Sequence, residues 1–137
     1  MKLTSDEIFF INMLYSISGA QARDCLIGDN VVSFLVRKKD VGKAIGKKAE
    51  NIKKLSKKTK KHIEIMEHCS DVIPFLRKAF YKIKTQRISK TENDGKTIVT
   101  VSLDSENRKK MLNNIGRIKR IKEFAKRNYK VDDIKIK

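Results

Sequence analysis

The stretch from Asp40 to Lys61 restricts how the rest of the chain can fold, because it combines a helical apolar face with a helix-breaking start. Its apolar side chains recur at the spacing of one helical face, namely at Ile45, Ala49, Ile52 and Leu55. Gly42 and Gly46 interrupt the helical pattern near the start of this face. The stretch therefore predicts a turn with bare backbone amides that leads directly into a helix.

The same helix is strongly cationic. Glu50 stands among nine lysines, which are Lys43, Lys47, Lys48, Lys53, Lys54, Lys57, Lys58, Lys60 and Lys61. Backbone N–H groups at a helix start attract phosphate, and lysines add counter-charge that is blind to base sequence. The pattern favours a nucleic-acid contact, and the alternative is a charged helix face that is only solvated.

Net charge supports the nucleic-acid hypothesis. The chain has 137 residues, enough for one compact domain or two very small ones, and carries a net charge of +17 with a pI near 10.0. Such a charge is typical of proteins that meet nucleic acid and, less often, an anionic membrane surface. A thermophile-type surface would add glutamate along with lysine. This chain has 33 Lys and Arg residues but only 16 Asp and Glu residues, so such a surface does not account for its basic excess.

The start of the chain is polar, and no apolar run approaches the roughly 18 residues needed to cross a bilayer. We therefore expect a cytoplasmic protein with no membrane partner. Cys25 and Cys69 are too few and too far apart for a disulfide framework, and a single bridge between them stays open.

Apolar periodicity and turn residues predict the first set of elements. A capping box at Thr4 and Glu7 starts a helix over 5–18 that Gly19 ends. Two strands over 21–27 and 31–36 flank a turn at 28–30 and form a hairpin. The turn and cationic helix follow, and a third strand covers 62–66.

The second half predicts the same order. Pro74 in a first turn indicates a helix over 72–83, and a hairpin covers 86–103 with its turn at 92–95. A basic helix capped by Asp104 or Ser105 follows, interrupted at 113–114 and at Gly116, and a strand closes the chain at 131–136. We expect the apolar faces over 8–17, 72–83 and 111–125 to be core.

A shift of 66 residues places the second half on the first without a gap. The strand over 31–36 falls on 97–102, Ile45 falls on Met111, and 52–55 falls on 118–121. Two basic amphipathic helices could match by chance, but the strand that matches at the same offset favours a true repeat.

With these elements, the segment 41–55 resembles the K-homology (KH) family, in which I-G-x-x-G precedes a helix of this kind. Two tandem copies resemble the compact archaeal relatives of the transcription factor NusA. The resemblance implies an α+β fold of two type II KH domains, each a three-stranded sheet packed by helices, at 1–67 and 68–137. Ala49 replaces the second glycine of the first motif, and the second motif, over 112–115, has lost both glycines.

KH modules bind single-stranded RNA or DNA, and the resemblance assigns positions in this chain. Gly46, Lys47, Lys48 and Ala49 would clamp the backbone. Other first-module contacts would come from Lys43, Ile45, Asn51, Ile52, Lys53 and Lys54. The groove floor would be Val32 and Phe34 or their neighbours Ser33 and Leu35, and the register stays open. In the second module the candidates are Lys109, Lys110, Asn113, Asn114, Arg117, Lys119 and Arg120.

Catalysis and metal binding have little support in the sequence. His62, His68 and Cys69 are close in the chain, but no CxxC-type pair completes a zinc site and no nucleophile motif surrounds them. We therefore expect no enzyme activity, no metal, no cofactor and no small-molecule substrate.

The resemblance thus predicts a protein that holds nascent single-stranded RNA and influences transcription termination or antitermination. RNA polymerase is a further partner that the resemblance suggests. Alternatives are a ribosome-associated or RNA-processing KH protein, and an interaction module on RNA polymerase that barely touches RNA.

Overall fold

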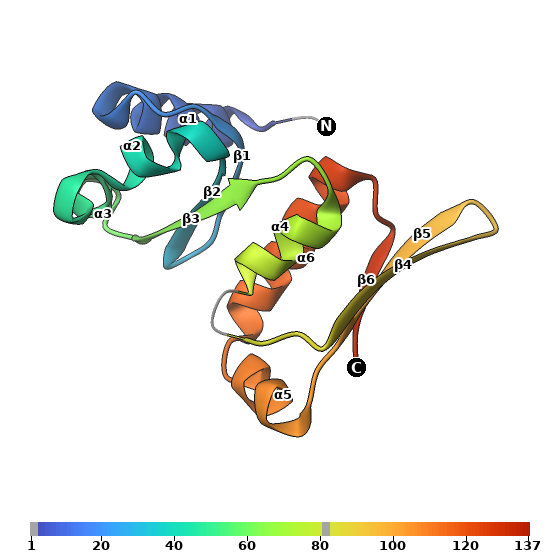
Figure 1. Cartoon of the computed structure of the whole chain (residues 1–137). Coiled ribbons are helices and arrows are strands. Elements are labelled where there is room, and N and C mark those ends of the chain that lie inside the picture. The colour runs from blue at the N-terminus through green and yellow to red at the C-terminus, as the bar shows by residue number, and fades with distance from the viewer. Residues whose placement is uncertain (1–2, 81–82) are drawn as a thin grey trace. The chain divides into compact units, whose positions relative to one another are not determined.

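The computed structural model describes residues 3–80 and 83–137. The chain forms two compact units, Met1–Cys69 and Ser70–Lys137, each of which has its own sheet (Figure 1).

Unit 1 is built around the three-stranded sheet β1-β2-β3. Strand β2 (Val31–Arg37) pairs antiparallel with β1 (Ala22–Ile27) and parallel with β3 (His62–His68). Helix α1 (Ser5–Ser18) precedes the sheet. Between β2 and β3 lie a short 3-10 turn (Lys38–Asp40), α2 (Val41–Ile45), a second 3-10 turn (Lys47–Ala49) and α3 (Glu50–Thr59). A parallel pair needs such a crossover connection.

The core of unit 1 joins the helices to one face of the sheet. Val32, Phe34 and Val36 of β2 are fully buried together with Leu14 of α1, Ala44 of α2 and Leu55 of α3. These β2 residues alternate, so they share one face of the strand. The two helices on either side of the Lys47–Ala49 turn are therefore tied to a rigid sheet.

Both predicted ends of the first helix are confirmed. The Thr4 hydroxyl accepts from the Glu7 amide at 3.1 Å, and the Glu7 carboxylate accepts from the Thr4 amide at 2.9 Å. Gly19 adopts φ 76° and its amide donates to the Tyr15 carbonyl at 2.8 Å. This is the left-handed cap that glycine provides at helix ends.

Unit 2 repeats the order of unit 1. Helix α4 (Val72–Ala79) precedes the sheet β4-β5-β6, in which β5 (Lys96–Ser102) pairs antiparallel with β4 (Arg87–Asn93) and parallel with β6 (Asp133–Ile136). Helices α5 (Ser105–Leu112) and α6 (Ile115–Tyr129) connect β5 to β6. Asp104 caps α5 by accepting from the Asn107 amide at 2.8 Å.

The helices of unit 2 pack through aromatic and aliphatic side chains. Phe75 of α4 contacts Tyr129 of α6, with ring centroids 5.2 Å apart. Phe124 and Ile121 of α6 are fully buried, as is Val99 of β5. The α+β class is confirmed, with six α-helices and two three-stranded sheets in the described part of the chain. None of the described helices is both long and apolar enough to span a bilayer.

The prediction that the apolar faces are wholly core is wrong at two helices. In α1, Ile8, Phe9 and Tyr15 are 46%, 61% and 54% exposed, because apolar residues surround this helix and only one side meets the sheet. At the α5–α6 junction, Leu112 and Ile115 are 67% and 53% exposed.

Three boundaries also differ from the prediction. The predicted helix over 72–83 ends at Ala79, and residues 81 and 82 lie outside the described part. Gly42 lies within α2 and does not break it. The apolar series from Ile45 to Leu55 belongs to two helices, since Gly46 ends the first of them.

The gap-free shift of 66 residues is off by one in the central strand. It places Val32 and Phe34, which belong to the core cluster with Leu14 and Leu55, on Ile98 and Thr100, which are only half-buried. In the sheets, Val32 pairs with the buried Ile63 and Val99 pairs with the buried Ile134, so Val99 is the counterpart of Val32. The fully buried positions of β5 are instead Val99 and Val101. A one-residue slip exchanges the two faces of a strand, so a match by residue type alone can miss it.

Candidate nucleic-acid interface

The turn between α2 and α3 has a backbone shape that L-residues rarely adopt. Gly46 has φ 77° and ψ 168°, Lys48 has φ 54° and ψ 33°, and Ala49 has φ 59° and ψ 28°. The Ala49 amide donates to the Gly46 carbonyl at 3.1 Å. Within the described residues, the amides of Lys47 and Lys48 donate to no protein acceptor. Two free donors and two exposed lysine side chains thus share one turn.

Gly46 is required here for both conformation and space. Its φ and ψ lie in a region that is essentially restricted to glycine. A Cβ at this position would lie 2.8 Å from Nδ2 of Asn51 and 3.0 Å from the Asn51 amide nitrogen. Both the backbone conformation and the lack of space therefore explain why glycine occupies the first position of the predicted motif.

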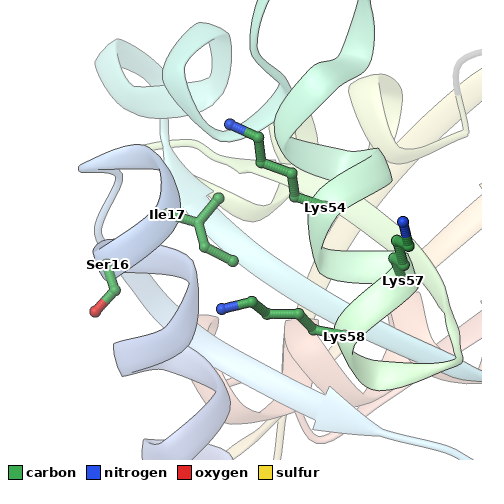
Figure 2. Close-up of a pocket in the computed structure, with 5 residues that line it drawn as sticks. All are labelled: Ser16, Ile17, Lys54, Lys57 and Lys58. Atoms are coloured by element: carbon green, nitrogen blue, oxygen red, sulfur yellow. The ribbon is translucent and has the colours of Figure 1, made fainter.

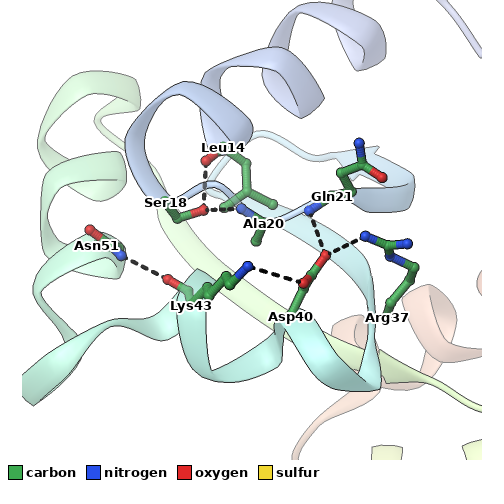
Figure 3. A network of polar contacts seen from close by, with 8 residues as sticks. All are labelled: Leu14, Ser18, Ala20, Gln21, Arg37, Asp40, Lys43 and Asn51. Atoms are coloured by element: carbon green, nitrogen blue, oxygen red, sulfur yellow. Dashed lines mark hydrogen bonds and ion pairs between the residues drawn. The ribbon is translucent and has the colours of Figure 1, made fainter.

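Asn51 explains why there is no room at Gly46. Its side-chain Nδ2 donates to the Lys43 carbonyl at 2.7 Å, which links the first turn of α3 to the end of α2 (Figure 3). The resemblance assigned Asn51 to the nucleic-acid groove, and the structure places its amide as a brace across the turn. The resemblance pointed to Asn51, but the sequence could not show that the Asn51 side chain would bond to the Lys43 carbonyl.

A buried carboxylate holds the other end of α2. Asp40 is 2% exposed, and its Oδ2 accepts from the Gln21 amide at 3.1 Å and from the Arg37 guanidinium at 2.9 Å (Figure 3). Lys43 Nζ lies 3.9 Å from Oδ1. The amide of Gln21 and the guanidinium of Arg37 hold the pKa of Asp40 below its ordinary value. Sequence analysis missed this anchor, which joins the residue before β1, the end of β2 and the start of α2.

Lysines extend the positive surface from the turn along α3. Lys54, Lys57 and Lys58 line a hollow of about 580 Å³ whose other wall is Ser16 and Ile17 of α1 (Figure 2). Figure 2 shows the amino group of Lys58 reaching across toward Ile17. Lys53 is exposed on the same helix. This surface can attract a polyanion without reading its sequence.

The residues proposed as the groove floor are not accessible. Val32 and Phe34 lie in the core, and Ser33 and Leu35 are also buried. The Ser33 hydroxyl donates to the Glu64 carboxylate at 2.6 Å. The apolar residues next to the turn that keep some exposure are Ile45 and Ile52, both half-buried.

The corresponding turn of unit 2 has a different shape. Asn113 has φ −80° and Asn114 has φ −131°, so neither takes the left-handed conformation that asparagine could have supplied. Only these two residues separate α5 from α6. Gly116 lies inside α6 and takes no part in the turn. The left-handed turn of unit 1 is therefore not reproduced here.

Of the basic residues predicted in unit 2, some are exposed to solvent, whereas Arg117 contacts a neighbouring helix. Lys109, Lys110 and Lys119 are exposed, and Lys110 Nζ lies 4.0 Å from the Glu106 carboxylate. Arg117 donates from Nε and a terminal nitrogen to the Ala79 carbonyl, at 3.3 and 2.8 Å. Arg117 thus ties α6 to the end of α4. Arg120 is half-buried on the same helix.

The histidines and cysteines do not gather into a ligand set. Within residues 3–80 and 83–137, no three His, Cys, Asp or Glu side chains lie where they could hold one metal ion. Cys25 is buried and Cys69 half-buried, and the two do not form a disulfide. Burial and the nearby Arg23 lower the pKa of His68.

Known proteins match this chain over most of its length. A model of the KH domain matches residues 12–112. The probable transcription termination protein NusA of Methanocaldococcus jannaschii is 30% identical over 99% of this chain and 75% of its own length. The protein of the same name from Methanococcus vannielii is 28% identical over 99% of this chain and 79% of its own. That from Halococcus morrhuae is 23% identical over 98% and 96%.

A solved structure shares the fold. The crystal structure of APE1850 superimposes with a TM-score of 0.84 at 26% identity, and the match covers 98% of this chain and all of the other. The similarity therefore extends to both units and not to one of them alone.

Replacing Ala49 by glycine is expected to stabilise the chain. A left-handed L-residue costs roughly 1–2 kcal/mol, and glycine removes this strain. Because glycine loses more conformational entropy on folding than alanine does, part of the gain in stability is offset. We expect the free energy of unfolding to rise by about 0.5–1 kcal/mol in urea denaturation. Lys53→Gly, in the body of α3, should instead lower it by about 1 kcal/mol. A loss of stability in Ala49→Gly would contradict the left-handed conformation.

Asp40→Asn is expected to destabilise the chain in a pH-dependent way. The lowered pKa means that the carboxylate stabilises the fold above its ordinary value of 3.8, and this contribution is lost as pH falls below that value. Unfolding curves of the two proteins should therefore differ at pH 7 and converge in acid. Asp29→Asn, in the exposed turn after β1, is the control for charge. A difference that is constant with pH would refute the assignment.

Proposed function

The chain belongs to the family of archaeal NusA-like proteins with a KH domain, and on that premise we propose that it binds single-stranded RNA through the Gly46–Ala49 turn. The observation that carries the proposal is the turn itself, with two free amides and two exposed lysines on a left-handed backbone. Oriented amides of this kind form anion-binding sites, and phosphates are the repeated anions of RNA.

We infer that each unit is a type II KH module, divided close to the predicted boundary of 1–67 and 68–137. The inference is supported by the shared order of helices and strands and by the sheet that joins one antiparallel to one parallel pair in both units. The first module would supply the backbone clamp. The second would contribute Lys109, Lys110, Lys119 and Arg120, with Asn113 and Asn114 at its altered turn.

The biological role that we propose is non-catalytic and comes from the relatives. Proteins named for transcription termination match nearly the full length of this chain. We propose that the chain holds nascent RNA near RNA polymerase and so influences termination or antitermination. Lys43, Lys53 and Lys54 would extend the contact from the clamp along the phosphate backbone, with Ile45 and Ile52 at the bases.

Binding of a fluorescent single-stranded oligouridine, measured by anisotropy over a salt series, tests the clamp. Lys47→Asp/Lys48→Asp should lose most of the affinity. Removal of two phosphate contacts should also flatten the plot of log affinity against log salt by roughly 1.4, at about 0.7 per contact for single strands. Gly46→Asp should lose affinity as well, because it changes the shape of the turn.

The chain offers a matched control. Lys38 and Lys39 are also two exposed lysines in a 3-10 turn of unit 1, and they directly precede Asp40. Lys38→Asp/Lys39→Asp changes the net charge by the same amount but leaves the clamp intact. Equal losses in the two double variants would show general attraction without a clamp, and unchanged binding in Lys47→Asp/Lys48→Asp would refute the site.

A further inference from the structure

A hollow of about 360 Å³ opens on unit 2 beside the altered turn. Its floor combines Met111 of α5, Ile118 of α6 and Ile136 of β6. Met111 and Ile118 are 5% and 8% exposed, so their side chains form part of the folded unit and fix the shape of the hollow.

Two exposed aliphatic residues form the rim of this hollow. Leu112 and Ile115 are 67% and 53% exposed, and they stand where a KH clamp would have its two glycines. Bulky side chains at these positions prevent close approach of a phosphate to the backbone. Large apolar groups gathered at one exposed place are typical of interaction surfaces.

The charged residues of the hollow are all cations. Arg108, Lys119 and Lys122 line it, and no carboxylate is among its lining residues in the described part of the chain. Arg108 also donates to the Leu103 carbonyl at 3.2 Å, which holds its guanidinium near the rim. An apolar floor enclosed by positive charge fits a ligand that is apolar on one side and acidic on the other.

We propose that this hollow is a docking site for an acidic amphipathic segment of a partner protein. Aliphatic side chains of the segment would enter between Leu112, Ile115 and Ile118, and its carboxylates would pair with Arg108, Lys119 and Lys122. Helices that bind grooves use this division between an apolar and a charged face. The adaptable side chain of Met111 at the floor suits such packing.

The lining favours a peptide over RNA. Among the residues that the structure describes, none that lines the hollow is aromatic, whereas unpaired bases are commonly held by stacking on aromatic rings. The neighbouring turn has no left-handed residue to present free amides as unit 1 does. The proposal does not depend on RNA binding by unit 1, so the two sites can fail separately.

Selection of short peptides, about 14 residues or four helical turns, from a random display library against the full chain tests this site. The selected peptides should be acidic, with aliphatic residues three and four positions apart. Leu112→Asp/Ile115→Asp should weaken their binding at least tenfold by anisotropy, and binding should weaken as salt is raised. Both residues are exposed, so these changes should leave the fold intact.

Ile8→Asp/Phe9→Asp is the matched control, because it places the same charges on exposed apolar residues in the first half of α1. It should leave peptide binding unchanged. The proposal is overturned if no acidic amphipathic peptide is selected, or if both double variants bind the peptides equally. It is also overturned if Leu112→Asp/Ile115→Asp lowers oligouridine binding as much as Lys47→Asp/Lys48→Asp does, since the hollow would then serve RNA.

Discussion

The hydrogen bond from the Asn51 side chain to the Lys43 carbonyl is the contact on which the candidate interface depends. It connects two helices across a turn whose backbone is strained at Lys48 and Ala49, and such strain persists only where the surroundings fix it. Asp40 fixes the far end of α2, and Leu55 fixes α3 in the core. The free amides of the turn are thus oriented before any ligand arrives, which lowers the entropy cost of binding.

The two units use one arrangement of elements for different surface chemistry. In unit 1 glycine and a left-handed alanine shape a turn in which, within the described residues, two backbone amides have no protein acceptor. In unit 2 leucine and isoleucine cover the equivalent backbone and border an apolar hollow. Since both turns join helices that pack on a similar sheet, a few substitutions at one turn can change the class of ligand without a change of fold.

Sequence patterns correctly predicted the features that depend only on residues close together in the chain, such as helix ends and turns. The capping box at Thr4, the left-handed Gly19 and the turn at Gly46 are all recognisable from residue type and spacing. Periodicity tells which residues share a helix face but not how much of a face the sheet covers, so Phe9 and Leu112 were wrongly expected in the core. The contacts of Asp40 and Asn51 join distant segments, and no sequence pattern marks their partners.

The most direct measurement is a ¹⁵N–¹H NMR titration of the full chain with a short single-stranded oligouridine. The backbone amides of Lys47 and Lys48 should shift first and farthest, because they are the free donors at the clamp. Amides of α3 near Lys54 should follow, and those of Leu112 to Ile118 should shift later and less, because the altered turn has no left-handed backbone. Shifts centred on the α5–α6 junction, with the amides of the Gly46–Ala49 turn unmoved, would contradict the account.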